Sequence, residues 1–118
     1  MDDLDALRDR LRAFAAERDW DRFHDPKNLA MALTAEAGEL LEVFQWLTTD
    51  EVRSEVSPED KKAASEELAD ILIYAVRMAD VLHIDLVEAA EAKLTLNAER
   101  YPVDLSRGNA TKYDRRDP

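Results

Sequence analysis

The placement of proline and glycine constrains the fold of this chain more than any other feature. Its 118 residues include only two glycines and four prolines. Pro26 and Pro58 each follow a residue that caps helices well (Asp25 and Ser57), which is the pattern of a helix start. Pro102 cannot continue a helix and therefore ends one. Between these points Ala, Leu, Glu and Arg dominate, and all of them favour helix. The sequence predicts an all-α fold.

The periodicity of apolar residues predicts four helices, at about 3–18, 26–47, 59–82 and 86–101. The polar stretch 48–57 lacks periodicity and is predicted to be a loop, and Asp85 is predicted to cap the last helix. Short connections favour antiparallel neighbours, so we expect a four-helix-bundle-like subunit. Residues 1–118 would form a single domain, with 102–118 as a flexible C-terminal tail. The third helix is apolar around most of its circumference, which predicts an oligomer whose subunits share a core.

Composition excludes several classes of function. The sequence has no cysteine, so thiolate metal sites and disulfides are excluded. No apolar run approaches the roughly 20 residues of a membrane span. The net charge of −11 disfavours binding to nucleic acid. We therefore expect a cytoplasmic protein that acts on neither nucleic acid nor membrane.

Two pairs of acidic residues are the main functional signal. Glu36 and Glu39, and likewise Glu67 and Asp70, are three residues apart, so each pair lies on one helix face. At three or four positions from these acids the sequence has mostly small or apolar residues and no Lys or Arg. Four unpaired carboxylates from two helices would suit Mg²⁺, or Mn²⁺ as an alternative. Ordinary exposed acids are the competing interpretation. Redox iron is disfavoured because neither histidine lies three residues after a Glu.

Aromatic residues accompany the acidic pairs. Trp46 lies seven residues after Glu39 and Tyr74 seven after Glu67, so each should lie about two helical turns further along the same face. Such rings could stack on a planar ligand. For Tyr74, plain core packing remains an equal alternative. Trp20, in a segment with His24 that breaks the helical pattern, is better explained by ligand contact.

A polar stripe is predicted on the last helix. Lys93, Asn97 and Arg100 recur at i, i+4 and i+7, so they share one face. Two cations with an amide between them could bind phosphate oxygens. By spacing alone, however, an ordinary solvated face is the better interpretation.

The order of these motifs resembles that of a known family. The motifs are Trp20…Phe23-His24…Pro26-Lys27-Asn28-Leu29, Glu36-x-x-Glu39-Leu-x-Glu42-x-Phe-Gln-Trp46, Glu66-Glu67-Leu-x-Asp70-x-Leu-Ile-Tyr74, and Lys93-x-x-x-Asn97-x-x-Arg100-Tyr-Pro102. In this order they are similar to the MazG-like nucleotide pyrophosphohydrolases, and within them to the dCTP pyrophosphatase branch. The likeness covers about residues 14–113.

The resemblance implies a function and a set of site residues. The expected reaction is Mg²⁺-dependent hydrolysis of a nucleoside triphosphate, dCTP or a modified dCTP, to the monophosphate and pyrophosphate. The expected assembly is a homotetramer built as a dimer of dimers. The implied metal ligands are Glu36, Glu39, Glu67 and Asp70, the candidate catalytic carboxylates are Glu36, Glu39 and Glu42, and the implied substrate contacts are Trp20, His24, Lys27, Trp46, Tyr74, Lys93, Asn97 and Arg100. The tail around Ala110 to Tyr113 is a candidate lid.

Two departures from the family pattern affect the predicted base preference. The segment 48–57 is shorter than in animal members and lacks their Trp, and a polar substrate contact of theirs falls at or near Leu11. The alternative class of function is a non-catalytic helical module that binds a nucleotide or a protein partner.

Overall fold

The predicted all-α class is confirmed by the computed structural model, which describes residues 3–116 and contains no strand in that range. The helices are α1 (Asp3–Glu17), α2 (Pro26–Phe44), α3 (Thr49–Ser54), α4 (Pro58–Val81), α5 (Leu86–Arg100) and α6 (Val103–Ser106), with 3₁₀ turns η1 (Asp21–Phe23) and η2 (Tyr113–Arg115). The four long helices fall where the sequence predicts them. α2 ends at Phe44, three residues before the expected end.

The predicted helix starts are confirmed by their hydrogen bonds. The Asp25 carboxylate accepts a bond from the backbone N–H of Asn28 at 2.8 Å, and the Ser57 hydroxyl accepts one from Asp60 at 3.1 Å. At the start of α5, Asp85 accepts from the N–H of Glu88 at 3.0 Å. Each cap satisfies a backbone donor that the helix itself leaves without a partner. These boundaries were predictable because they depend on neighbouring residues alone.

The predicted loop at 48–57 is wrong, because its centre is the short helix α3. The Thr48 side chain accepts from the N–H of Glu51 at 3.2 Å, while the Glu51 carboxylate accepts from the N–H of Thr48 at 3.3 Å. This reciprocal capping box stabilises a single helical turn. Six residues are too few to show an apolar period, so the pattern gave no sign of it.

The C-terminal tail contains more regular structure than its sequence pattern indicates. α6 and η2 both lie in it. The Tyr113 ring meets the Tyr101 ring edge-on with centroids 5.9 Å apart, and the Arg100 guanidinium lies 4.7 Å from the centre of the Tyr113 ring. These contacts fold the tail back on the end of α5. A role as a lid stays a prediction.

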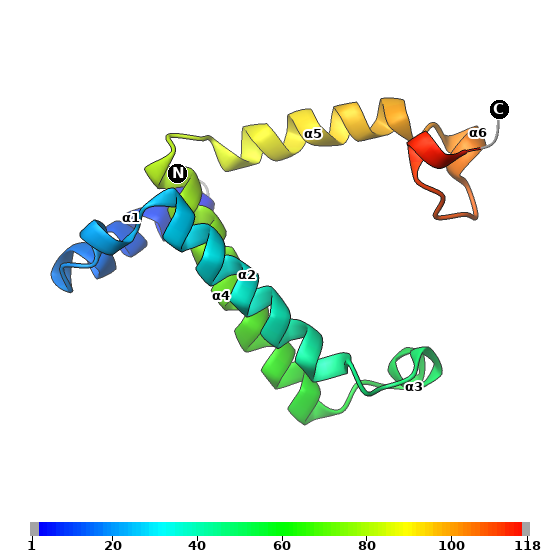
Figure 1. Ribbon diagram of the computed structural model, residues 1–118, viewed down its shortest axis with the longest axis horizontal. Helices are drawn as coiled ribbons and strands as arrows, with labels where there is room; N and C mark the ends of the chain where they lie inside the picture. The colour runs from blue at the N-terminus through cyan, green and yellow to red at the C-terminus, as the bar shows by residue number, and fades with distance from the viewer. Residues whose placement is uncertain (1–2, 117–118) are drawn as a thin grey trace. The chain divides into compact units, whose positions relative to one another are not determined.

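The chain divides into two compact units, Met1–Ile84 and Asp85–Pro118. In the first unit α2 and α4 run side by side and antiparallel (Figure 1), and α1 packs on α4. The most buried apolar side chains are Ala15 from α1, Leu29 from α2, and Val76 and Ala79 from α4. All four lie near the end of the hairpin where α1 joins it, so the core is formed there.

The bundle arrangement and the oligomeric state stay predictions. The second unit contains α5, α6 and η2, so only three of the four predicted long helices belong to the first. Leu41 on α2 and Leu68 on α4 are 64% and 54% exposed in this chain. Within the described range no helix is long and apolar enough to span a membrane.

Candidate active site

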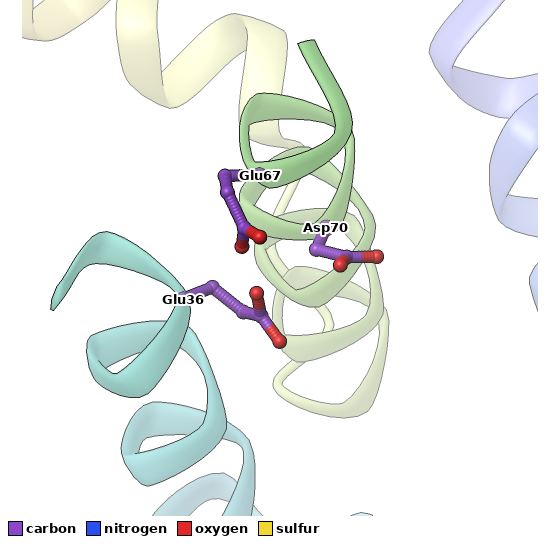
Figure 2. Close-up of side chains that lie close together, drawn as sticks. All are labelled: Glu36, Glu67 and Asp70. Atoms are coloured by element: carbon purple, nitrogen blue, oxygen red, sulfur yellow. The ribbon is translucent and has the colours of Figure 1, made fainter. Parts of the chain in front are cut away.

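Three carboxylates from α2 and α4 converge in the first unit. Glu36, Glu67 and Asp70 each offer an oxygen, and these oxygens all lie within 4.8 Å of one another. Figure 2 shows the Glu36 side chain from α2 pointing towards Glu67 and Asp70 from α4. All three residues are partly buried. The geometry thus brings together residues from both predicted pairs, as the helical spacing implied.

The electrostatics of this carboxylate cluster favour a cation. Hydrogen bonding to Glu67, burial, hydrogen bonding to Glu39 and the negative charges of Glu39 and Asp70 together raise the pKa of Glu36 from 4.5 to about 8. Apart from a proton that Glu36 would hold, the buried Oε2 atoms of Glu36 and Glu67 have no hydrogen-bond partner. Two ionised carboxylates can only accept, so a proton or a cation must lie between them to relieve the repulsion.

The residues present fit a hard divalent ion. Carboxylate oxygens are the ligands that Mg²⁺ prefers, and the orphaned Oε2 atoms are available to one. Glu39, the fourth predicted ligand, is exposed and lies outside the group of three, although it is close enough to Glu36 to raise its pKa. Glu42, the remaining candidate catalytic carboxylate, is exposed one turn further along α2.

A pocket of about 420 Å³ adjoins the carboxylate cluster, because Asp70 belongs to both. Its apolar wall includes Leu7, Leu11 and Phe14 of α1. This volume falls in the range of small-molecule sites, and such sites combine an apolar lining with a few placed polar groups. Trp20, His24 and Tyr74, three of the predicted substrate contacts, also line the pocket.

The turn after α1 places Trp20. Asp19 adopts a left-handed conformation with φ 54°, and the N–H of Trp20 then bonds back to the carbonyl of Ala15 at 2.9 Å. This is a Schellman helix end, and Asp is among the few non-glycine residues that tolerate it. The Trp20 ring consequently meets the Phe14 ring edge-on, with centroids 5.7 Å apart.

Tyr74 lies within reach of the negative charges of the cluster. Burial first, and then the charges of Glu36 and Asp70, raise the pKa of Tyr74. The hydroxyl therefore stays protonated and can donate a hydrogen bond. Tyr74 is thus a wall of the pocket rather than only a core residue.

Two further predicted substrate contacts of the first unit, Lys27 and Trp46, do not line this pocket. Trp46 follows the end of α2 and is 86% exposed, and Lys27 is exposed in the first turn of α2. The three residues predicted on the last helix, Lys93, Asn97 and Arg100, lie on α5 in the second unit. Their phosphate contacts stay predictions.

Sequence reasoning missed a network of charges at the far side of the pocket. Arg77 of α4 is 8% exposed and contacts Asp21, His24 and Asp80. Asp80 also accepts from the Nε of Arg12 on α1 at 2.7 Å. The available sequence signal for this network was the pair Arg77 and Asp80, three residues apart on a largely apolar helix. The sequence did not show which partners they would meet.

The fold and the site define an all-α protein in which an acidic cluster that could hold a cation adjoins an aromatic pocket. The chain belongs to the MazG-like family, whose model matches residues 31–115. It is 52% identical over 106 residues to dCTP pyrophosphatase 1 of Mus musculus and 48% identical to that of Homo sapiens. The matched region is 88% of this chain and 62% of either relative, so the chain spans less than two thirds of their length.

A solved structure agrees with this assignment. A pyrophosphatase from Archaeoglobus fulgidus superposes with a TM-score of 0.80 at 39% identity, covering 86% of this chain and 94% of that one. The family resemblance read from the motifs is therefore confirmed.

Proposed function

We propose that this protein is a nucleoside triphosphate pyrophosphohydrolase acting on dCTP or a modified dCTP. Water attacks the α-phosphorus, the bond between that phosphorus and the α–β bridging oxygen breaks, and the products are the nucleoside monophosphate, pyrophosphate and a proton. The observation that carries this proposal is Asp70, which lines the aromatic pocket and also belongs to the carboxylate cluster. A ligand with its base in the pocket would therefore have its phosphates near the cluster. The names of the relatives support the substrate class.

The carboxylate cluster would hold Mg²⁺, with Mn²⁺ as an alternative. Glu36, Glu67 and Asp70 would be ligands, and Glu39 would join them from the next turn of α2. When bound, the ion supplies positive charge that neutralises the triphosphate. A carboxylate oxygen of Glu36, Glu39 or Glu42 would accept the proton of the attacking water. Of these three, Glu36 is the one inside the cluster.

The pocket would bind the nucleoside. Trp20 and Tyr74 offer aromatic surfaces, and stacking on such a ring contributes about 1–3 kcal/mol per base. Lys27, Lys93, Asn97 and Arg100 are proposed to contact phosphate, and Trp46 the base, within a homotetrameric assembly in the cytoplasm. The exposed apolar side chains of the α2–α4 hairpin, such as Leu41 and Leu68, support an assembly of copies.

The experiment that tests this proposal measures pyrophosphate release from each ribo- and deoxyribonucleoside triphosphate, with Mg²⁺ and with EDTA. We expect release that EDTA abolishes and that is fastest with dCTP or a modified dCTP. Release favouring another base would keep the chemistry and refute the assignment of substrate. No release from any nucleotide, in protein shown to be folded by circular dichroism, would refute the enzyme and favour a binding module.

A further inference from the structure

The guanidinium of Arg77 is buried and its donors are divided among three residues. Nε donates to Nδ1 of His24 at 3.0 Å, and Nη1 donates to Asp80 at 3.4 Å. Nη2 donates to Asp21. Asp80 is itself held from the opposite side by two donors of Arg12. Arg77 is therefore held by Asp80 on its own helix and by the segment that carries Asp21 and His24.

The contact with His24 determines where the imidazole proton lies. An arginine has no acceptor and does not lose its proton in proteins, so it can only donate. Nδ1 of His24 must then accept through its lone pair. A neutral imidazole has one donor and one acceptor nitrogen, so the proton is on Nε2. Burial and the charge of Arg77 also lower the pKa of His24, against a smaller opposing effect of Asp21.

We propose that Arg77 is a positioning residue that holds His24 as the neutral tautomer with its proton on Nε2, so that His24 presents a hydrogen-bond donor to an acceptor atom of the base. His24 and Arg77 both line the pocket and contact each other. The part of this proposal that concerns a base rests on the proposed function. The part that concerns the tautomer rests on the contacts of Arg77 alone.

A fixed donor at this position would discriminate between pyrimidines. Cytosine offers acceptors at O2 and N3, whereas in uracil and thymine N3 carries a hydrogen. A donor facing N3 would form a hydrogen bond with cytosine. With thymine, the same donor would face the N3–H group, and the two donors would oppose each other. Much of the surrounding wall is apolar, including Leu11 and Phe14, so water would not readily satisfy the unpaired groups.

The first test is the nitrogen-15 spectrum of the two histidine rings in the full chain at neutral pH. We expect His24 to show a protonated Nε2 and an unprotonated Nδ1 as a single tautomer. His83 is exposed at the end of α4 and serves as the internal reference, with an averaged mixture of tautomers. A proton on Nδ1 of His24, or a doubly protonated ring, would overturn the proposal. This measurement needs no variant to fold.

The second test compares Arg77→Met with Arg12→Gln. Arg77→Met keeps much of the side-chain volume and removes the donor, and Asp80 still has Arg12 as its partner. We expect the His24 ring to become a tautomer mixture. We expect the KM for dCTP to rise about tenfold, the free energy of one hydrogen bond, with kcat changed less than twofold. The preference for dCTP over dTTP should fall by a similar factor.

Arg12→Gln is the control because it removes the other guanidinium that binds Asp80 without touching His24. It should lower the melting temperature and leave the His24 tautomer and the base preference unchanged. Equal effects of both variants on the tautomer would mean that Arg77 is only structural. A third outcome is that His24 shows the single Nε2–H tautomer but the protein hydrolyses no nucleotide. This result would support the positioning role of Arg77, and it would overturn both the use of His24 in base recognition and the proposed function. Turnover of dCTP by a chain with the proton on Nδ1 would overturn the positioning role alone.

Discussion

Replacing Glu67 by glutamine should raise the melting temperature relative to the wild type when no metal is present and lower it relative to the wild type when Mg²⁺ is added. Without metal, Glu67 and Glu36 oppose two buried oxygens that lack a donor. An amide at this position would remove one negative charge and could donate to Glu36, so the metal-free variant should melt above the wild type. With Mg²⁺ the order should invert, because the variant has lost one of three converging ligands.

The size of the inversion follows from mass action. A ligand that binds only the folded state at a hundred times its Kd stabilises by about 2.7 kcal/mol. In a domain of this size each kcal/mol moves the melting temperature by roughly 4 °C or somewhat more, so wild type should gain about 10 °C. Loss of one ligand among three should weaken binding about a hundredfold or more, since even outer partners of a metal site are worth 10- to 100-fold. At the same Mg²⁺ concentration the variant should therefore gain about 2 °C or less.

The assay is thermal melting by circular dichroism, in EDTA and across a MgCl₂ titration. Glu66→Gln is the matched control, because Glu66 is the adjacent residue on α4, is exposed, and loses the same charge. It should keep the full response to Mg²⁺. If Glu67→Gln responds to Mg²⁺ as strongly as Glu66→Gln and the wild type, the cluster is not the metal site and the reasoning fails.

Two further predictions test the fold beneath the site. Asp80→Asn should destabilise the protein most at pH values above the ordinary Asp pKa of 3.8, because Arg12 holds the folded-state pKa of Asp80 below that value. In urea unfolding, the difference in unfolding free energy from the wild type should shrink as the pH falls through the folded pKa. A difference independent of pH would contradict the ion-pair account. Leu29→Ala removes a side chain that is 1% exposed and should lower the free energy of unfolding by about 2–5 kcal/mol, whereas a loss under about 1 kcal/mol would mean that Leu29 is not in the core.

The parts of the structure that were predictable from sequence depend on residues close together in the chain. The caps at Asp25 and Ser57 act on backbone groups three positions away. The faces of α2 and α4 follow from helical periodicity, so the convergence of Glu36 with Glu67 and Asp70 needed only the further assumption that these helices pair. The short connections between the helices, which favour antiparallel neighbours, supplied that assumption.

The parts that escaped prediction depend on contacts between distant segments. The partners of Arg77 come from η1 and the residue after it, and its support through Asp80 comes from α1. No spacing rule relates these segments. The predicted placement of Trp46 on the helical face of Glu39 is wrong for a different reason, because α2 ends at Phe44 and that face stops there. Its contact with the substrate stays a prediction.

One face of α4 carries Glu67, Asp70, Tyr74 and Arg77, at successive spacings of three, four and three residues. The proposed cation ligands, a pocket wall and the residue proposed to orient His24 thus form a single helical stripe. Leu7, Leu11 and Phe14 of α1 face the same pocket without belonging to the acidic cluster. A changed side chain on α1 would therefore reshape the cavity and leave the proposed hydrolytic residues intact. An engineer seeking a different base preference would randomise α1 and hold α4 constant.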